Sequence, residues 1–522
     1  MLIRVFGAKC VGIDAVKVTV EVIIDRGIGI HLVGLADVAV KESLLRTTTA
    51  LQALGYHIPG KRIVINLAPA DVHKNGSGYD LPIAIGVIAA SEQRELPLAG
   101  QFMMMGELGL DGSVRGIPGG LPFAELAGQE GFRGIILPID SALEAAELKQ
   151  GLVYGVRNLD DVVRILSGEE CDDLLVWNTE EYNRLSAEGP MQGTGEIPDF
   201  SDILGQEGAK RGLEIAAAGA HNVCMIGPPG SGKSSLAKAL VGILPPMSRE
   251  ESLMTSKIFS IAGKGKLRYG LMDRRPFRAP HYSASLAAIV GGGAGDGIIP
   301  GEISLAHNGL LFLDEAAQMP RSVCEALRGP IEDRKVVISR LKAKVEYPAS
   351  FMLVMASNPC PCGYWGMGDK CTCTPSQRLN YISKLSGPMM DRIDIQLNVP
   401  SVAAADLVRL KAGGAPEPSA SVAERVAAAR AVQRKRFARE DIFTYAEMGN
   451  KQIERYCPLS RECGDLLVSL MERMGLSMRA YFRIIKVART IADLEASPDI
   501  LPRHISEAAA YRFLDRTTGV RF

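Results

Sequence analysis

The residues with the clearest chemical meaning form a glycine-rich loop between a short apolar run, ending at 226, and a helical pattern over 235–240. Glycines let backbone N–H groups converge on phosphate oxygens, and the following helix adds the positive end of its dipole. The string G-x-x-x-x-G-K-S in this strand-to-helix context predicts an ATP-binding loop rather than a chance glycine turn. Its members are Gly227, Pro228, Pro229, Gly230, Ser231, Gly232, Lys233, Ser234 and Ser235.

Two residues of this loop have distinct expected tasks. Lys233 can reach the β- and γ-phosphates, and Ser234 can hold a Mg²⁺ ion that accompanies ATP. A second motif lies about eighty residues later, where the apolar run 309–313 ends in Asp314 and Glu315. We predict that Asp314 orients the Mg²⁺ and that Glu315 polarises the attacking water. Without the loop, two acids after an apolar run would indicate only the end of a strand.

Three further polar residues are candidates for the same site. Asn358 ends the apolar run 351–357, where an amide can sense the γ-phosphate; capping a turn is the alternative. Arg392 lies in a charged loop just before an expected strand, from which a guanidinium could reach the nucleotide of a neighbouring subunit. Arg479 starts the helical pattern that runs to 494, and a helix-start arginine can also reach a nucleotide or serve the fold alone.

Four cysteines are grouped in two C-x-C pairs: Cys360, Cys362, Cys371 and Cys373. Four thiolates that converge on one ion favour zinc. The spacing is tighter than the usual C-x-x-C, so a redox loop or a metal-free loop stays open. The other cysteines show no such grouping and are interpreted as ordinary thiols.

Two segments could contact DNA. The first, from 264 to 278, has six basic residues with two aromatic ones among them: Lys264, Lys266, Arg268, Tyr269, Arg274, Arg275, Phe277 and Arg278. The second, 335–347, alternates apolar and polar residues around a basic centre and predicts a hairpin with Lys and Arg at its tip. Such segments suit a phosphate backbone, and a solvated insertion without a ligand is the alternative.

Length and composition indicate about three domains in a soluble globular protein. The chain has 522 residues, of which 47% are hydrophobic and 23% charged. No apolar stretch is long enough to span a bilayer and the first residues lack a signal-peptide layout, so we expect a cytoplasmic protein. Basic and acidic residues balance at 59 each, so DNA contact must come from local patches or from a ring of subunits.

The pattern divides the chain into four parts. Residues 1–167 predict an α/β domain, with strands at 63–67 and 134–138 and a buried helix at 81–90. Residues 168–198 are acidic and then rich in Gly and Pro, which is typical of a solvated linker. Residues 199–400 predict an α/β ATP-binding domain, and 401–522 a helical lid domain.

The first domain resembles the proteolytic domain of Lon peptidases. The resemblance rests on KNGSGYDLP at 74–82, GELGLDG at 106–112 and GGLP at 119–122. It implies a serine activated by a lysine, but Gly78 stands at the serine position and Pro122 at the lysine position. We therefore predict a scaffold without proteolytic activity; a dyad shifted to Ser77 and Lys74 is the alternative.

The rest of the chain resembles the magnesium-chelatase-like branch of the AAA+ ATPases, and the whole chain resembles the YifB/ComM family. The motifs GPPGSGKS, RPFRAPHY, PGEISLAHNG, LFLDEA, NPCPCG, LSGPMMDRID and SMRAY stand in the order that this family uses. Its motifs place Lys233 and Ser234 in Walker A, Asp314 and Glu315 in Walker B, Asn358 at sensor 1, Arg392 as the arginine finger and Arg479 at sensor 2.

The resemblance implies a hexameric DNA helicase that drives branch migration during natural transformation. Two other functions stay open. One is the motor subunit of an enzyme that inserts a metal into a tetrapyrrole, as in magnesium chelatases. The other is an ATP-dependent protease or chaperone.

Overall fold

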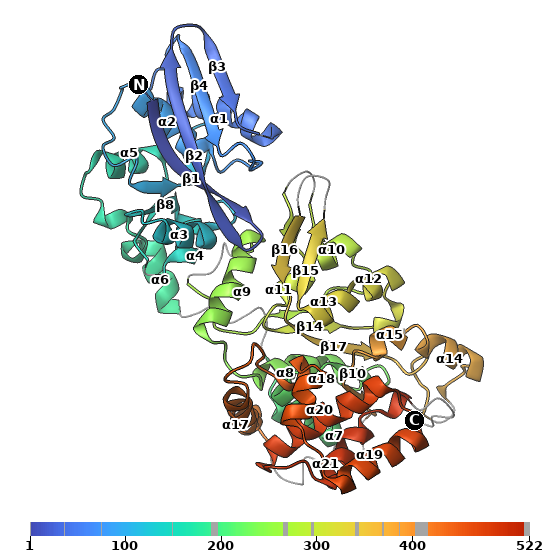
Figure 1. Ribbon diagram of the computed structural model, residues 1–522. Coiled ribbons are helices and arrows are strands. Elements are labelled where there is room, and N and C mark those ends of the chain that lie inside the picture. The colour runs from blue at the N-terminus through green and yellow to red at the C-terminus, as the bar shows by residue number, and fades with distance from the viewer. Residues whose placement is uncertain are drawn as a thin grey trace.

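A computed structural model describes residues 2–35, 37–74, 76–148, 150–188, 197–264, 270–293, 297–339, 344–367, 370–385, 387–401 and 416–515. The chain forms an N-terminal α/β unit, a second α/β unit and a set of C-terminal helices (Figure 1). The α/β class with a helical C-terminal part, predicted from the sequence, is confirmed.

The first unit is built on a seven-stranded sheet in the order β3-β4-β2-β1-β5-β8-β9. The pairs β1–β2 and β2–β4 are antiparallel, and the other neighbours are parallel. The strands are β1 Leu2–Val11, β2 Asp14–Asp25, β3 Gly29–Val33, β4 Arg62–Ala68, β5 Phe102–Met104, β8 Gly134–Pro138 and β9 Leu152–Val156, and a separate hairpin joins β6 Glu107–Leu108 to β7 Val114–Arg115. The two strands predicted in this unit are confirmed as β4 and β8.

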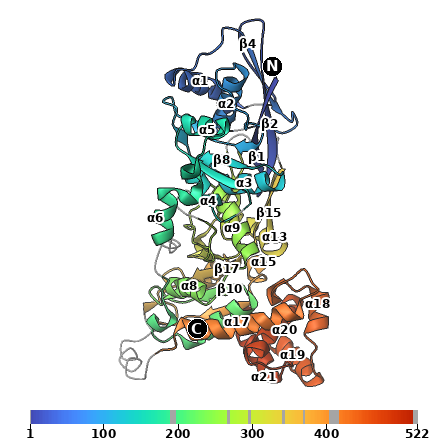
Figure 2. The same cartoon turned by 90° about the vertical axis from the view of Figure 1, so that its left-hand side faces the viewer.

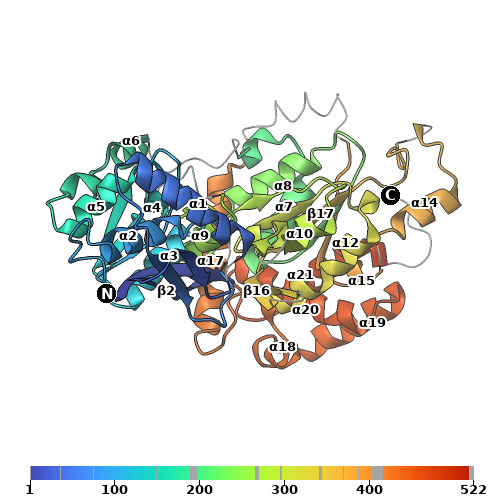
Figure 3. The same cartoon turned by 90° about the horizontal axis from the view of Figure 1, so that it is seen from above.

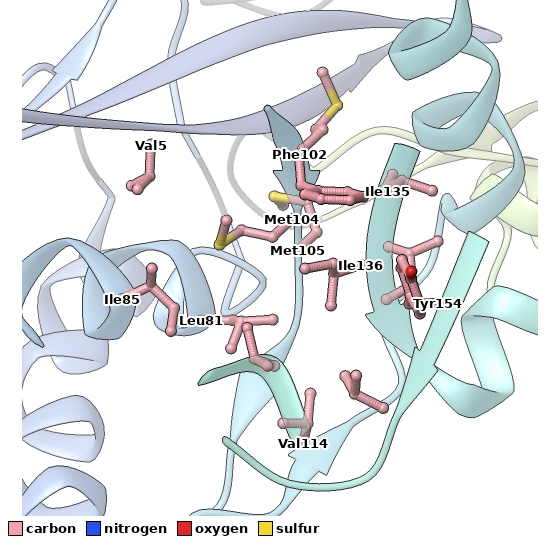
Figure 4. Packing of buried hydrophobic residues seen from close by; sticks show 14 of the residues in the cluster. Val5, Leu81, Ile85, Phe102, Met104, Met105, Val114, Ile135, Ile136 and Tyr154 are labelled. Carbon is pink, nitrogen blue, oxygen red and sulfur yellow. The ribbon is translucent and has the colours of Figure 1, made fainter. Parts of the chain in front are cut away.

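Helices pack on this sheet and close one large core. They are α1 Val38–Ala53, α2 Asp80–Ala90, α3 Gly120–Gln129, α4 Ile139–Ala145 and α5 Leu159–Ser167. Helix α2, predicted as a buried helix, is apolar on every side after its first residue and is buried along nearly its whole length. Figure 4 shows Leu81 and Ile85 of α2 in the same cluster as Met104 of β5 and Ile136 of β8.

The first core extends beyond the boundary that the sequence predicted. Residues 171–188 were expected in a solvated linker, but they form two 3₁₀ turns and helix α6 Glu180–Glu188. Leu174 and Val176 are buried in the first core, and Leu175 bridges to Tyr154 of β9. The expectation is wrong here because the acidic residues lie on the outer side of short turns whose apolar residues face inward. The Gly/Pro-rich part, 189–196, lies outside the described residues.

The second unit has a five-stranded parallel sheet in the order β11-β14-β17-β10-β18. Its strands are β10 Val223–Ile226, β11 Phe277–Arg278, β14 Leu310–Leu313, β17 Met352–Ser357 and β18 Ile395–Asn398. All residues of β10, β14 and β17 are buried, as their uninterrupted apolar runs predict for a parallel sheet covered on both faces. The three central strands therefore end at one common edge, which is where their loops must meet.

Short helices and hairpins surround this sheet. They are α7 Glu207–Gly219, α8 Lys233–Gly242, α9 Arg249–Ile261, α10 Leu286–Val290, α11 Glu302–Leu305, α12 Arg321–Ala326, α13 Arg328–Asp333, α14 Pro375–Ile382 and α15 Gly387–Met390, with the pairs β12 Gly291–Gly292/β13 Ile299–Pro300 and β15 Lys335–Ser339/β16 Lys344–Pro348. The hairpin predicted at 335–347 is confirmed by β15 and β16; its centre, 340–343, lies outside the described residues.

The C-terminal helices cover one face of the second sheet. They are α17 Ser419–Arg436, α18 Asn450–Tyr456, α19 Arg461–Met474, α20 Met478–Leu494 and α21 Pro502–Ala510. Buried residues of these helices join those of β10, β17 and α7 in one cluster, whereas the other face of the sheet forms a second cluster with α12 and β15. The helical part and the second sheet therefore share a core.

Helix α9 links the two units and lies between them in two perpendicular views (Figures 1 and 2). The Lys257 ammonium of α9 is 2.9 Å from the Asp14 carboxylate and also pairs with Glu125 of α3. Ser260 donates to the buried Glu144, and its carbonyl accepts from Gly119 N–H at 3.1 Å. Seen from above, the first unit lies beside the other two parts (Figure 3). Charged and backbone contacts thus join the units at α9.

Candidate nucleotide-binding site

The glycine-rich loop lies between the end of β10 and the start of α8, as predicted. Gly232, at the N-cap of α8, has φ of 91°, a left-handed conformation that favours glycine. Position 227 requires glycine for another reason: a Cβ there would lie 2.1 Å from the Val399 carbonyl oxygen. The sequence therefore specifies a tight loop that directs backbone N–H groups outward at a helix N-terminus.

Lys233 reaches across this loop. Its Nζ donates to the carbonyl oxygens of Gly227 at 2.7 Å and Pro228 at 2.8 Å, and it lies 3.4 Å from Oδ1 of Asn358. Burial lowers the pKa of Lys233, while the carboxylates of Asp314 and Glu315 oppose that shift. A partly desolvated ammonium at the centre of a phosphate loop gains from an anion, because its charge has little water around it.

The acidic motif meets the loop. Ser234 Oγ donates to Asp314 Oδ2 at 2.9 Å, and the other Asp314 oxygen accepts from the N–H of Glu315 at 2.9 Å. Glu315 has a left-handed backbone with φ of 50°, so the chain turns sharply directly after Asp314. A hydroxyl and a carboxylate side by side are oxygen ligands of the kind that Mg²⁺ prefers, so this pair fits the predicted ion.

Topology explains why these residues meet. The sheet order places β17 between β14 and β10, and all three are parallel. Their carboxyl ends supply Asp314 and Glu315, then Asn358, then the loop at Gly227. The side chains that the sequence predicted from three separate stretches thus come together at one sheet edge, the usual ligand position in open parallel sheets.

Arg392 lies at the opposite edge of the sheet. Strand β18 runs parallel to β10, and its first residue, Ile395, lies opposite Val223, the first residue of β10. Arg392 comes just before β18, so it lies at the amino ends of these strands, whereas the loop follows the carboxyl end of β10. The four residues of β10 separate it from the loop by about 13 Å. The Arg392 guanidinium is buried, pairs with Glu332 at 2.7 Å and donates from Nε to the Arg328 carbonyl at 3.2 Å. It is therefore not brought to the loop of its own chain.

Arg479 lies near Arg392 and not near the loop. It is in the first turn of α20, its side chain is 69% exposed, and its Nη1 is 2.7 Å from the Asp391 carboxylate. Asp391 directly precedes Arg392. The structure therefore brings Lys233, Ser234, Asp314, Glu315 and Asn358 together, and places the two candidate arginines elsewhere, with Arg479 paired to the residue before Arg392.

A buried network fixes the segment before β18, which contains Arg392, against α20, which contains Arg479. Asp394 pairs with Arg483 of α20 and accepts from the N–H of Asn222 at 3.0 Å. Burial alone would raise the pKa of Asp394, but the charge of Arg483, the hydrogen bond and charge of His221 and the charge of Lys486 together outweigh it and hold the pKa far below the usual range. Burial lowers the pKa of the adjacent His221, so Arg483 is the counter-charge of Asp394. This network ties α20 to the segment before β18.

Two residues at the site were missed by the sequence analysis. Gln206 has a left-handed backbone, and its amide donates to the carbonyls of Ser231 at 3.3 Å and Pro400 at 2.6 Å. Gly363 lies against the loop: a Cβ there would be 2.8 Å from Cδ of Pro229. A polar amide directly before a helix was a usable signal for Gln206. No local signal existed for Gly363, because its contact joins residues far apart in the sequence.

The four grouped cysteines converge as predicted. Their sulfur atoms all lie within 4.8 Å of one another, with Cys360 to Cys362 at 3.4 Å, Cys360 to Cys371 at 3.8 Å and Cys362 to Cys371 at 3.7 Å. Zinc–sulfur bonds of about 2.3 Å in a tetrahedron give sulfur–sulfur edges of about 3.8 Å. Cys360 and Cys373 are buried and the other two half-buried. The donor set and its spacing fit a zinc ion.

Several basic residues of segment 264–278 form ion pairs within the fold. Glu302 pairs with Arg278 at 2.6 Å and with Lys264 at 3.5 Å, and Arg275 pairs with Glu251 at 3.0 Å. Phe277 stacks on Phe312 with 5.9 Å between ring centres, so it belongs to the sheet packing and not to a contact surface. Arg274 is exposed and has no acidic partner among the described residues. Lys266, Arg268 and Tyr269 lie outside them.

The positions of a Lon-type dyad are filled differently. A Cβ on Gly78 would lie 2.9 Å from Cε of Met105, and Pro122 is buried in the first turn of α3. Ser77 donates to the Glu107 carboxylate, whereas the buried Lys74 donates to a backbone carbonyl. Neither the aligned pair nor the shifted pair forms a serine–lysine contact among the residues that the structure describes.

Family models match most of the chain. "Magnesium chelatase, subunit ChlI" matches residues 199–407, "Subunit ChlI of Mg-chelatase" matches 20–141, and "Magnesium chelatase, subunit ChlI C-terminal" matches 416–512. Within the described segments, no helix has both the length and the apolar character needed to cross a bilayer.

Relatives match over nearly the full length. YifB of Salmonella typhimurium is 42% identical over 506 residues, 97% of this chain and 96% of that protein. The competence protein ComM of Haemophilus influenzae is 41% identical over 514 residues, 98% of this chain and 97% of that protein. A DNA replication licensing factor, mcm6 of Dictyostelium discoideum, is 24% identical over 346 residues, 60% of this chain and 34% of that protein. The chain therefore belongs to the magnesium-chelatase-like AAA+ family that includes YifB and ComM.

Proposed function

We propose that this chain is an ATP-hydrolysing motor that acts on DNA as a ring of identical subunits, six by resemblance to its family. The observation that supports it best is the division of the site. Lys233, Ser234 and Asp314 meet at one edge of the sheet, and Arg392 lies at the other. Because Arg392 and Arg479 lie across the sheet from the loop of their own chain, we infer that a neighbour supplies them, and repetition of that head-to-tail contact would close a ring.

The residues at the edge have separate tasks in this proposal. Lys233 neutralises charge on the β- and γ-phosphates, and Asn358, next to it, orients the γ-phosphate. Ser234 and Asp314 would hold Mg²⁺, which when bound offsets phosphate charge. Glu315 takes the proton of the attacking water. Arg392 and Arg479 of the next subunit stabilise the charge that develops on the transferred phosphoryl group.

Three observations support DNA as the substrate. A relative of the same length is named a competence protein, and a more distant one a DNA replication licensing factor. Arg274 is an exposed cation without an acidic partner among the described residues. The net charge is zero, so binding would depend on such local cations repeated around a ring.

ATPase rates without DNA and with single-stranded, double-stranded and branched DNA test this proposal. We expect stimulation that is largest with branched DNA, and displacement of a strand from three-stranded substrates. If DNA does not stimulate ATP hydrolysis and no strand is displaced, the protein is an ATPase but the proposed DNA motor is rejected. Absence of ATP hydrolysis altogether would reject the ATPase as well.

A proteolytic function is not favoured, because Ser77 is paired with a carboxylate and position 78 is packed against Met105. Casein digestion by the wild type and by Ser77→Ala tests this point. We expect no digestion by either protein. Digestion by the wild type that Ser77→Ala abolishes would restore the shifted dyad.

A metal-insertion motor is the second candidate, because the matching family models describe magnesium chelatase subunits. It gives no task to the exposed cation Arg274. Retention of a tetrapyrrole-binding partner protein during purification, with an ATPase stimulated by that partner and not by DNA, would favour this function over the DNA motor.

We propose zinc as a third bound group, besides ATP and Mg²⁺, at the four cysteines. The sulfur–sulfur distances of 3.4 to 3.8 Å among Cys360, Cys362 and Cys371 support it, as does the burial of two of the four thiols. An ion held by four thiolates completes its coordination with protein ligands and leaves no open position, so its task is structural.

A further inference from the structure

We infer that the zinc site at Cys360, Cys362, Cys371 and Cys373 controls nucleotide binding by holding the phosphate loop in place. The inference rests on the nucleotide site proposed above. It concerns what the four thiols do for that site, beyond the binding of an ion.

The cysteine loop begins where the nucleotide site ends. Asn358 is followed by Pro359 and then Cys360, so the first thiol pair continues directly from β17. The N–H of Gly363 donates to the Cys360 carbonyl at 3.0 Å, which closes a turn around Cys362. Two ligands of the ion thus belong to the turn that follows the candidate γ-phosphate sensor.

This turn is in contact with the phosphate loop. A Cβ on Gly363 would lie 2.8 Å from Cδ and 2.9 Å from Cγ of Pro229, and 3.8 Å from Cγ of Asn358. Gly363 has φ of 83°, so only glycine adopts this conformation at no cost. The N–H of Gly227 also donates to the Ser357 carbonyl at 3.2 Å. The phosphate loop therefore rests on segment 357–363 at two points.

The second thiol pair is fixed by a different element. Thr374, directly after Cys373, caps α14, and its N–H donates to Gln377 Oε1 at 2.9 Å. Tyr381 of α14 is buried in the core on one face of the sheet. Arg378 of the same helix lies over the ring of Trp365, 5.2 Å from its centre. Helix α14 is thus attached both to the core and to the cysteine loop.

An ion bound by both pairs would join the end of β17 to the start of α14. The turn at Gly363 would then be held from two sides, and Pro229 would have a rigid surface to rest on. Without the ion, no bond links the two thiol pairs, so the turn loses that support. The phosphate loop would then lose conformational entropy when nucleotide binds, and this loss lowers the affinity of the site for nucleotide.

Three proteins test the inference: the wild type, Cys362→Ser/Cys371→Ser, and Gly363→Ala. Cys10→Ser, in the first unit, is the matched control because Cys10 is half-buried and outside the cluster. Zinc per chain is measured by elemental mass spectrometry, and binding of a fluorescent ATP analogue with Mg²⁺ is measured on the same samples. Co²⁺ alone, added to chelator-treated wild type, reports tetrahedral thiolate ligation by its visible absorption.

We expect one zinc per chain in the wild type and in Cys10→Ser, and none in the double variant. Loss of zinc should weaken nucleotide binding about tenfold, and zinc alone should restore it to chelator-treated wild type. Gly363→Ala keeps all four ligands, so it should retain zinc and still bind nucleotide about tenfold more weakly. Gly363→Ala therefore tests the contact with Pro229 even if the double cysteine variant fails to fold.

Several results would overturn the inference. A wild type that binds neither Zn²⁺ nor Co²⁺ rejects the metal site. Zinc-free wild type and Gly363→Ala that both bind nucleotide with unchanged affinity reject the coupling and leave the metal site standing. A wild type that contains zinc but binds no nucleotide rejects the proposed nucleotide site, and the coupling with it.

Discussion

Arg479 and Asp391 form an ion pair in which Nη1 and the carboxylate oxygen are 2.7 Å apart, and Asp391 is the residue directly before Arg392. The side chain of Arg479 is exposed, whereas that of Arg392 is buried against Glu332. Both arginines therefore lie at the same edge of one subunit, across the sheet from its phosphate loop. We expect them to serve the same neighbouring nucleotide, and to leave their present carboxylate partners when they do.

Mixed rings should show that the two arginines act together in trans. Arg392→Ala and Lys233→Ala should each be inactive alone, because one lacks the neighbour's contribution and the other the loop. In an equal mixture, about a quarter of the interfaces combine an intact loop with an intact arginine, and ATPase should recover to that extent. Arg479→Ala mixed with Lys233→Ala should behave in the same way.

The mixture of Arg392→Ala with Arg479→Ala distinguishes two arrangements. Each subunit then lacks one of the two arginines on the same edge, so no interface is complete and no activity should return. If Arg479 instead acts on its own chain, about a quarter of the interfaces become complete and activity returns. Failure of every mixture to exceed its separate components would reject a shared site.

Glu315→Gln should keep ATP binding and lose turnover. The amide is similar in size to the carboxylate but cannot accept a proton from water, so hydrolysis should fall by at least about a hundredfold. Binding of a fluorescent nucleotide and release of phosphate measure the two effects on one sample. Glu325→Gln is the control, since Glu325 is half exposed and pairs with Arg321 on α12. Equal hydrolysis by Glu315→Gln and the wild type would remove Glu315 from this role.

The candidate nucleotide site was predictable because each of its parts is local. Lys233 and Ser234 belong to one string, Asp314 and Glu315 to another, and Asn358 ends an apolar run. Each lies where a buried strand ends, and parallel pairing places such ends at one edge. Their convergence could therefore be predicted without any information about distant contacts.

Other features depend on pairings that no local pattern encodes. The ion pair between the buried Arg392 and the exposed Glu332 joins residues sixty positions apart, and an arginine in a loop is compatible with many roles. The contact of Gly363 with Pro229 is of the same kind. Residues 171–178 form turns that are too short to show a hydrophobic periodicity. Their acidic composition therefore led to the incorrect prediction of a solvated linker.

Lys257→Met should destabilise the contact between the two units. Lys257 is 8% exposed and pairs with Glu125, which is 16% exposed. Removing the ammonium leaves the Glu125 carboxylate buried without its counter-charge, which should cost about 3 kcal/mol. The midpoint of urea unfolding measures the loss.

Glu125→Gln in the Lys257→Met background should return much of this stability, because it removes the uncompensated charge. Lys17→Met is the matched control: its partner Glu130 is well exposed, so the change should stay within about 1 kcal/mol. Equal losses for Lys257→Met and Lys17→Met would show that the buried pair does not stabilise the contact between the units.

His307 should make the fold sensitive to acid between pH 6.5 and pH 4. It is buried after α11, and its Nδ1 accepts a hydrogen bond from the N–H of Ser350 at 2.9 Å. Burial lowers the pKa of His307 from 6.5 to about 4, and the charges of Arg275 and Arg334 add to the effect of burial. Below pH 6.5 the unfolded chain binds a proton that the folded chain does not, so stability falls as the pH falls.

From pH 7 to pH 5 this one group should remove about 2 kcal/mol of stability. His307→Asn isolates the effect, because an amide oxygen can accept from Ser350 N–H in place of Nδ1 and does not titrate. Urea unfolding of both proteins at the two pH values gives the comparison, and the shared contribution of all other groups cancels in the difference. We expect the variant to lose about 2 kcal/mol less than the wild type on acidification. An equal loss in the two proteins would show that the His307 imidazole takes up its proton in the folded state as readily as in the unfolded chain.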